Sequence, residues 1–169
     1  PIPAKIMLVG EAWGADEERK GEPFVGASGE ELNRMLHEVG IMRSECYTTY
    51  VCKTRPPEGL ISHWIAMKRA DISTNHTMLR DKYCTYHIHE GVKELETEIS
   101  MVQPNLIIAM GNLACWALTG HWGVLKWRGS QLTTKLGGHS CKVIPTLTTG
   151  AVLKEWSQRA VVLNDLRRA

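Results

Sequence analysis

A short apolar run that ends in a glycine-flanked turn constrains the fold of this chain more than any other feature. Residues 6–9 are apolar throughout, and the turn G-E-A-W-G follows at positions 10–14. Such a run before a glycine turn is typical of a strand buried on both faces, as in the parallel sheet of an α/β protein. Because these sheets present functional groups at the carboxyl ends of their strands, Glu11 is the first candidate for a functional carboxylate.

Similar apolar runs alternate with helical patterns along the chain. The expected strands lie at 6–10, 47–52, 106–110 and 142–145. The expected helices lie between Ser28 and Gly40, where Ser28 and Glu31 have capping-box spacing, and at about 92–101, 112–118 and 151–166. Alternating strands and helices predict right-handed crossovers and a parallel sheet. The expected fold class is therefore α/β, a three-layer α/β/α sandwich around a central four-stranded parallel sheet.

Composition sets bounds on size, charge and compartment. A chain of 169 residues with 43% apolar content is expected to form one domain, residues 1–169. The net charge of +2 is only mildly basic, so any contact with nucleic acid must come from local clusters of Lys and Arg. Five scattered Cys, without a signal peptide or an apolar run of transmembrane length, predict a protein of the reducing cytoplasm with no membrane partner.

Residues 58–90 break the alternation of strands and helices. They are polar and rich in Thr, His and Lys. We interpret them as an insertion on the binding side of the domain. Trp64, Ile65 and Met67 are expected to pack one short helix of this insertion onto the body.

Several motifs follow one another in an order that resembles the uracil-DNA glycosylase superfamily. They are G-E-A-W-G with A-D-E-E-R-K-G-E-P-F-V-G-A-S-G and L-N-R-M-L at 10–36, C-Y-T-T-Y-V-C-K-T-R-P-P at 46–57, the segments 94–111 and 144–169, and Arg128-Gly129. The chain is most similar to the family 4 branch and to the related domain of phage SPO1-type DNA polymerases. This resemblance implies a DNA glycosylase, which flips a nucleotide out of DNA and hydrolyses its N-glycosidic bond.

The resemblance assigns roles to residues of the first motif. Glu11 occupies the position of the acid that positions or polarises a water, and Gly10 and Ala12 flank it at the base pocket. Backbone N–H groups beside this carboxylate are expected to keep it ionised. Phe24, the only Phe in the chain, occupies the position of the aromatic ring that stacks on the flipped base. Packing in the core is the alternative role for Phe24.

Two base-pocket positions depart from the family pattern. Tyr50 replaces the Asn that reads the edge of uracil, and its ring would partly fill a uracil pocket. Thr148 replaces the His that donates a hydrogen bond to the base oxygen as negative charge develops there. A hydroxyl can donate a hydrogen bond, but it cannot carry a positive charge. These changes predict a base specificity different from that of plain uracil glycosylases, or an inactive site.

The family's [4Fe–4S] cluster is a third point of difference. The resemblance places Thr54 and Gly91 where family members have cluster Cys residues, and no Cys precedes Cys46. Because a cluster needs a full set of thiolates, we predict that this chain holds no iron–sulfur cluster and no other cofactor. Cys84, His87 and His89 form C-x-x-H-x-H, a zinc-like spacing. A solvated strand in the insertion is the interpretation we prefer for that segment.

Basic residues near the expected site are candidates for DNA contacts. Lys53 and Arg55 follow the second strand, and backbone amides of the helix opened by Ser28 can hold a phosphate. Alternatively, Arg55 pairs with an acid such as Asp16 or Glu17. The segment 121–128 mixes aromatic and basic residues, including Lys126 and Arg128, as single-strand platforms do, although its Trp residues suit a core equally.

Two functions from different classes remain open at this stage. The first, which we favour, is a DNA glycosylase that acts on uracil or a modified base in single- or double-stranded DNA. The second is a catalytically inactive glycosylase-fold module that binds DNA or a protein, such as a polymerase or another phage replication protein. A monomer in the cytoplasm of a bacterial or phage-infected cell is expected in either case.

Overall fold

The computed structural model describes residues 2–169 and has the expected α/β class. Within this range the main sheet has five strands in the order β2-β1-β5-β7-β6. The strands are β1 (Ile6–Ala12), β2 (Tyr47–Cys52), β5 (Leu106–Met110), β6 (Leu132–Thr134) and β7 (Cys141–Thr146). β1, β2, β5 and β7 are parallel and correspond to the expected strands, whereas β6 pairs with β7 antiparallel. The sheet is thus mixed, because a three-residue edge strand that was too short to predict joins it.

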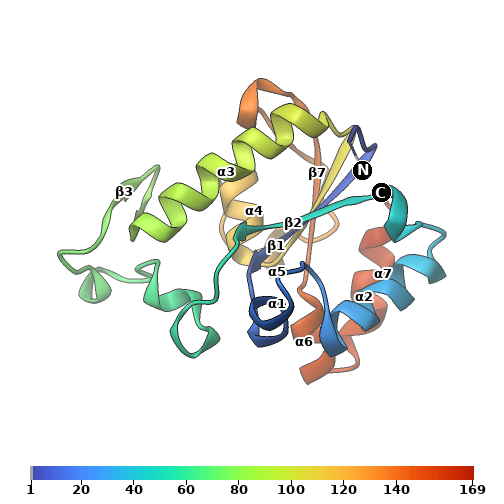
Figure 1. Ribbon diagram of the computed structural model, residues 1–169, viewed down its shortest axis with the longest axis horizontal. Helices are drawn as coiled ribbons and strands as arrows, with labels where there is room; N and C mark the ends of the chain where they lie inside the picture. The colour runs from blue at the N-terminus through green and yellow to red at the C-terminus, as the bar shows by residue number, and fades with distance from the viewer. Residues whose placement is uncertain (1) are drawn as a thin grey trace.

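Helices cover both faces of the sheet. They are α1 (Ala15–Lys20), α2 (Gly26–Glu38), α3 (Tyr86–Val102), α4 (Asn112–Thr119), α5 (Val124–Trp127), α6 (Thr149–Lys154) and α7 (Gln158–Leu166). Figure 1 shows α3 and α4 on one side of the sheet and α2, α6 and α7 on the other. The three-layer sandwich predicted from the sequence is confirmed. No helix within residues 2–169 is both long and apolar enough to cross a membrane.

The alternation of side chains along β1 explains the two layers. Met7 and Val9 pack in the cluster formed with α3 and α4, whereas Leu8 packs in the cluster formed with α2 and α7. All three side chains are fully buried, because β1 lies between β2 and β5. This two-sided burial is the physical reason why the strand reads as a continuous apolar run.

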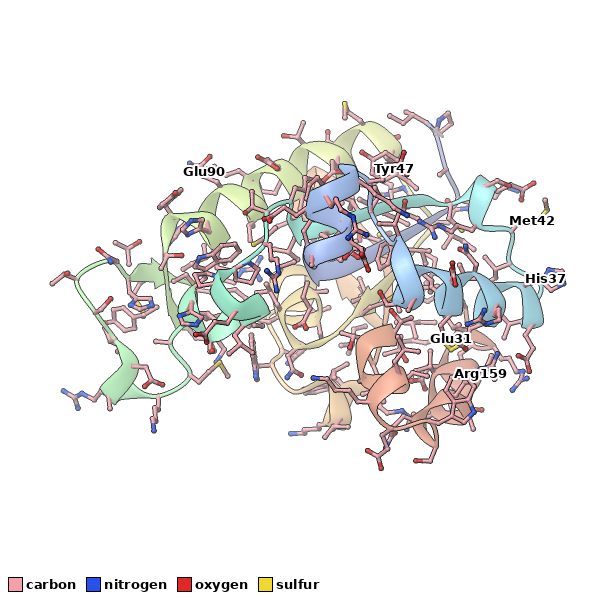
Figure 2. The ribbon with its side chains drawn as sticks, turned by 60° about the horizontal axis from the view of Figure 1, so that its bottom comes forward. Glu31, His37, Met42, Tyr47, Glu90 and Arg159 are labelled. Carbon is pink, nitrogen blue, oxygen red and sulfur yellow. The ribbon has the colours of Figure 1, made fainter. Side chains whose placement is uncertain are left out.

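The start of α2 differs from the prediction. The helix begins at Gly26 after an extended Val25, so Ser28 lies inside it and forms no capping box with Glu31. Glu31 is instead fully buried and pairs with Arg34 at 2.9 Å and with Arg159 of α7 at 2.6 Å. Although burial raises the pKa of Glu31, hydrogen bonds from these arginines bring that pKa below its ordinary value. Glu31 and Arg159 therefore join two helices of one layer (Figure 2).

Other helix boundaries also differ from the prediction. The single helix expected at 151–166 is two helices, α6 and α7, with an extended Glu155 between them. α3 begins at Tyr86, six residues before the expected start. α1 was not predicted; the acidic residues of its first turn suit the positive end of a helix dipole.

Residues 58–90 contain a small hairpin and single 3₁₀ turns before α3 begins. β3 (Thr77–Leu79) pairs antiparallel with β4 (Lys82–Cys84). The short α-helix expected around residues 64–67 is wrong, because Trp64 ends a 3₁₀ turn (Ile61–His63), Ile65 pairs with Cys84 in a β-bridge, and Met67 is 47% exposed. Arg80 donates to the Trp116 carbonyl oxygen at 2.6 Å, which attaches the hairpin to α4. The segment extends to one side of the sandwich (Figure 1).

Candidate active site

A pocket of about 410 Å³ lies at the carboxyl ends of β1, β2 and β5. Several residues singled out in the sequence line it together: Gly10, Glu11, Ala12, Phe24, Ser28, Tyr50 and Thr148. The end of β1, the loop that follows α1, the start of α2, the end of β2 and the N-cap of α6 supply these residues. The pocket therefore collects parts of the chain that lie far apart in the sequence, at the edge of the sheet where α/β proteins place their sites.

Glu11 is half-buried at the end of β1 and contacts the start of α4. Its Oε2 accepts a hydrogen bond from the Leu113 N–H at 2.8 Å. Burial raises the pKa of Glu11 above its ordinary value, and the Leu113 N–H opposes that shift only in part. Of the backbone N–H groups expected beside this carboxylate, that of Leu113 donates to it. A carboxylate with a raised pKa is a stronger base than an ordinary glutamate.

Gly111 brings Glu11 and Thr148 close together. Its φ of 99° is in a region that side chains rarely adopt, and a Cβ there would lie 2.6 Å from Glu11 Cδ and 2.7 Å from Thr148 Cγ2. The absence of a side chain at Gly111 therefore leaves room for both candidate catalytic side chains between β5 and α4.

Thr148 is the N-cap of α6. Its Oγ1 accepts a hydrogen bond from the Ala151 N–H at 3.1 Å. The cap uses the hydroxyl as an acceptor and leaves its hydrogen free to be donated into the pocket.

Phe24 and Tyr50 form a stacked pair in one wall of the pocket. Their ring centroids are 4.5 Å apart with an interplanar angle of 20°, and the Tyr50 hydroxyl accepts a hydrogen bond from the Phe24 N–H at 3.3 Å. Both rings are almost fully buried. Phe24 therefore packs in the core and also lines the pocket. The Tyr50 ring covers one face of the Phe24 ring.

The sequence reasoning missed other pocket residues. Glu17 is buried, accepts hydrogen bonds from Gly14 N–H at 2.9 Å and Val25 N–H at 3.2 Å, and so closes the loop that carries Phe24. Lys154 contributes an exposed ammonium to the rim. The only sequence signal for Glu17 and Lys154 was that they lie inside the motif segments 10–36 and 144–169. The spacing of residues in the sequence does not reveal that either one lines the pocket.

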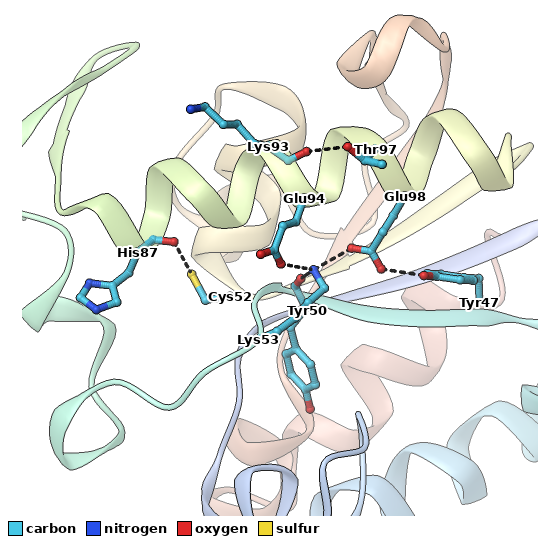
Figure 3. A network of polar contacts seen from close by, with 9 residues as sticks. All are labelled: Tyr47, Tyr50, Cys52, Lys53, His87, Lys93, Glu94, Thr97 and Glu98. Carbon is cyan, nitrogen blue, oxygen red and sulfur yellow. Dashed lines mark hydrogen bonds and ion pairs between the residues drawn. The ribbon is translucent and has the colours of Figure 1, made fainter.

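Two of the expected DNA contacts are held by carboxylates instead. Lys53 Nζ lies 2.6 Å from Glu98 Oε1 and 3.6 Å from Glu94 Oε2. Tyr47 donates to Glu98 at 2.8 Å, so this network ties β2 to α3 (Figure 3). Burial and the neighbouring Glu98 raise the pKa of Tyr47 to about 12.

Arg128 lies in a second such arrangement. Its guanidinium binds both carboxylate oxygens of Asp165, at 2.7 and 3.1 Å, and Asp165 is fully buried. Thr146 donates to the same carboxylate at 2.8 Å. Arg128 thus braces β7 and α7.

Arg55 and Lys126 are exposed. Arg55 pairs with neither Asp16 nor Glu17, because Asp16 pairs with Arg19 at 2.6 Å and Glu17 accepts the two backbone N–H groups described above. In the segment 121–128, His121 stacks on Trp127 at 4.2 Å, and Lys126 Nζ lies 5.2 Å from the centre of the Trp127 ring.

The residues present do not fit a four-thiolate cluster. Within residues 2–169, no three His, Cys, Asp or Glu side chains are grouped closely enough to hold a metal ion. The zinc-like trio is dispersed, because Cys84 is buried, His87 stacks between Trp64 and Tyr86, and His89 bonds to Thr77 at 2.9 Å.

Comparisons with known proteins identify a matching family and several relatives. The model of the family described as the uracil DNA glycosylase superfamily matches residues 1–167. A type-4 uracil-DNA glycosylase of Thermotoga maritima is 30% identical over 99% of this chain and 77% of its own length. The type-4 enzymes of Archaeoglobus fulgidus and Sulfurisphaera tokodaii are 29% and 27% identical, each over 98% of this chain and over 75% and 68% of their own lengths.

Proposed function

The chain belongs to the uracil-DNA glycosylase superfamily, and on this basis we propose that it hydrolyses the N-glycosidic bond of a base flipped out of DNA. The observation that carries the proposal is the position of Glu11. It lies at the end of β1, anchored by the Leu113 N–H, in the same pocket as Phe24 and Thr148. Relatives named type-4 uracil-DNA glycosylases support the same class of reaction.

The proposed reaction uses Glu11 and one water. Glu11 Oε1, which makes no hydrogen bond with the described residues, accepts one from the water and orients its oxygen toward C1′ of the sugar. The C1′–N bond breaks, the water oxygen bonds to C1′, and the water proton passes through Glu11 to the departing base. The ionised carboxylate also stabilises the positive charge that develops on the sugar. Thr148 donates its hydroxyl hydrogen toward the base oxygen.

The same pocket predicts slow excision of plain uracil. Tyr50 stacks on Phe24, where we propose that a flipped base would stack. Thr148 supplies a neutral donor only, and the loss of one strong donor to a developing anion costs about a hundred- to a thousandfold in rate. We therefore propose that the chain acts on a modified base, or on uracil at a low rate.

Oligonucleotides test this proposal directly. Single- and double-stranded oligonucleotides that carry uracil, deaminated purines, or oxidised or alkylated bases are incubated with the protein and scored for abasic sites. The proposal expects abasic sites at one of these bases, and it expects Glu11→Gln to prevent their formation. If no base is excised by the folded protein, the glycosylase proposal is wrong.

A second function is favoured by one observation, the closed Phe24–Tyr50 stack. A glycosylase-fold module that binds DNA or a protein would not need an open base pocket. It would bind DNA with equal affinity whether or not a modified base were present. Selective binding of one modified base would instead favour the enzyme.

We propose that DNA contacts come from the exposed basic residues Arg55, Lys126 and Lys154 and from the amides near Ser28; Lys154 and Ser28 line the pocket itself. Gly59, from the loop that follows Arg55, lines the same pocket, which places that loop at the rim. Action as a monomer on cytoplasmic DNA, with a phage or bacterial polymerase as a partner, completes the proposal.

A further inference from the structure

Arg43 reaches from the turn before β2 to the loop that carries Phe24. Its Nη1 donates to the Phe24 carbonyl oxygen at 2.8 Å, and its Nη2 donates to the Pro23 carbonyl oxygen at 2.9 Å. Nη1 also donates to Asn33 Oδ1, on α2, at 2.8 Å. The guanidinium carbon lies 5.8 Å from the centre of the Phe24 ring. One side chain thus ties this loop to both α2 and the start of β2.

The Phe24 backbone needs such support. Its φ of 51° lies in the left-handed region, which a residue with a Cβ adopts only at a cost. The Phe24 carbonyl also lies directly against α2 at Gly29, where any Cβ would collide with that oxygen. The direction of this backbone sets the direction of the ring, so contacts that fix the carbonyl also fix the pocket wall.

We propose that Arg43 is a positioning residue, which holds the Phe24 backbone so that its ring faces the base pocket. This inference rests on the proposed function, in which that ring stacks on a flipped base. Arg43 lines a separate cavity on the outer side of the loop, so it acts through Phe24 and does not touch the base. Lysine cannot substitute, because a point charge cannot bridge two carbonyl oxygens as the guanidinium fork does.

The composition of the chain offers a specific probe. Phe24 is the only Phe, so replacing phenylalanine by meta-fluorophenylalanine gives one fluorine NMR signal, which comes from this ring. The signal is compared in the parent, Arg43→Gln, Arg43→Lys and the control Arg34→Gln. The control removes an arginine of α2 that pairs with Glu31 and does not contact Phe24. Circular dichroism verifies that each variant is folded.

We expect the signal of both Arg43 variants to move toward its position in urea-unfolded protein, and that of Arg34→Gln to remain at the parent position. If Arg43→Gln does not fold, the fluorine signal of Arg43→Lys alone tests the inference. A folded Arg43 variant with the parent signal overturns the inference. This readout needs no catalysis, so an inactive parent would count against the proposed function alone. On a base that the parent excises, Arg43→Lys should be about a hundredfold slower, as expected for a displacement of about 1 Å.

Discussion

Replacing Tyr50 and Thr148 together should convert the pocket into one that excises uracil. The Tyr50 ring is held by its stack on Phe24, worth about 0.5–1.5 kcal/mol beyond burial, and by the Phe24 N–H bond, worth about 0.5–1.5 kcal/mol. A flipped base must displace the Tyr50 ring from Phe24 at a cost of about 1–3 kcal/mol. This cost lowers the fraction of pockets open to a base roughly 5- to 150-fold. Tyr50→Asn removes this barrier and supplies a donor and an acceptor for the pyrimidine edge.

Thr148→His restores a strong donor to the base oxygen, worth about a hundred- to a thousandfold in rate. The double variant should therefore excise uracil at least about five hundredfold faster than the parent, although residues of one site do not act additively. Its folding cost is about 3 kcal/mol for the lost buried ring and about 1 kcal/mol for the lost cap of α6.

The assay is single-turnover cleavage of uracil-containing DNA after alkali treatment, with thermal unfolding to verify that each variant is folded. Tyr50→Phe is the matched control, because it keeps the stacked ring and loses only the hydrogen bond from the Phe24 N–H; uracil excision should then rise by no more than about tenfold. Two results would refute the reasoning: strong uracil excision by the unaltered protein, or no gain in a folded double variant. The second would favour the binding module.

The remaining predictions concern Glu11, the two arginines Arg128 and Arg55, and the iron–sulfur cluster. Glu11→Gln should abolish excision and leave DNA affinity within a few-fold, because the carboxylate acts on the developing cation. The folded state raises the pKa of Glu11, so ionisation of Glu11 destabilises the fold as the pH rises through that raised pKa. Glu11→Gln removes this charge and should therefore unfold at an equal or higher temperature than the parent at pH 7. The parent's excision rate should fall on acidification at a pH above the pKa of an ordinary glutamate. Excision by the variant at the parent rate would contradict the role. Arg128→Met should lower the free energy of unfolding by about 3–5 kcal/mol in urea, because it leaves buried Asp165 unpaired. Arg55→Met should leave stability unchanged and lower the salt dependence of DNA binding by about one charge; the opposite pattern would refute both assignments. Iron and sulfide analysis of purified protein should find no stoichiometric cluster, and visible absorbance from one would overturn that expectation.

The sequence located the parallel strands because two-sided burial leaves a continuous apolar run. Helix boundaries were less visible, because distant contacts set them. Val25 lies just before α2, and its N–H is held by Glu17, eight residues earlier. The break after α6 carries neither Gly nor Pro. Edge strand β6 has three residues, too few for a periodic signal.

The candidate site was predictable where it depends on strand ends. Glu11 and Tyr50 end adjacent parallel strands, so their proximity follows from the sheet alone. The roles of Lys53 and Arg128 depend on which carboxylate lies opposite. Glu98 is 45 residues beyond Lys53, and Asp165 is 37 residues beyond Arg128. A basic residue near a predicted site is therefore weak evidence for a DNA contact until its neighbours are known.

The pocket residues differ in how they affect the stability of the fold, and the difference follows their proposed roles in hydrolysis and in base recognition. Burial opposes the ionised form of Glu11, so its carboxylate destabilises the fold. Functional groups often break the rules of stability in this way. Tyr50 and Thr148 are locally satisfied, one by a stacked ring and an N–H donor, the other by capping a helix. They stabilise the structure whether or not a base binds. A costly acid beside two locally satisfied side chains supports our proposal that Glu11 is the hydrolytic group in a pocket that does not favour plain uracil.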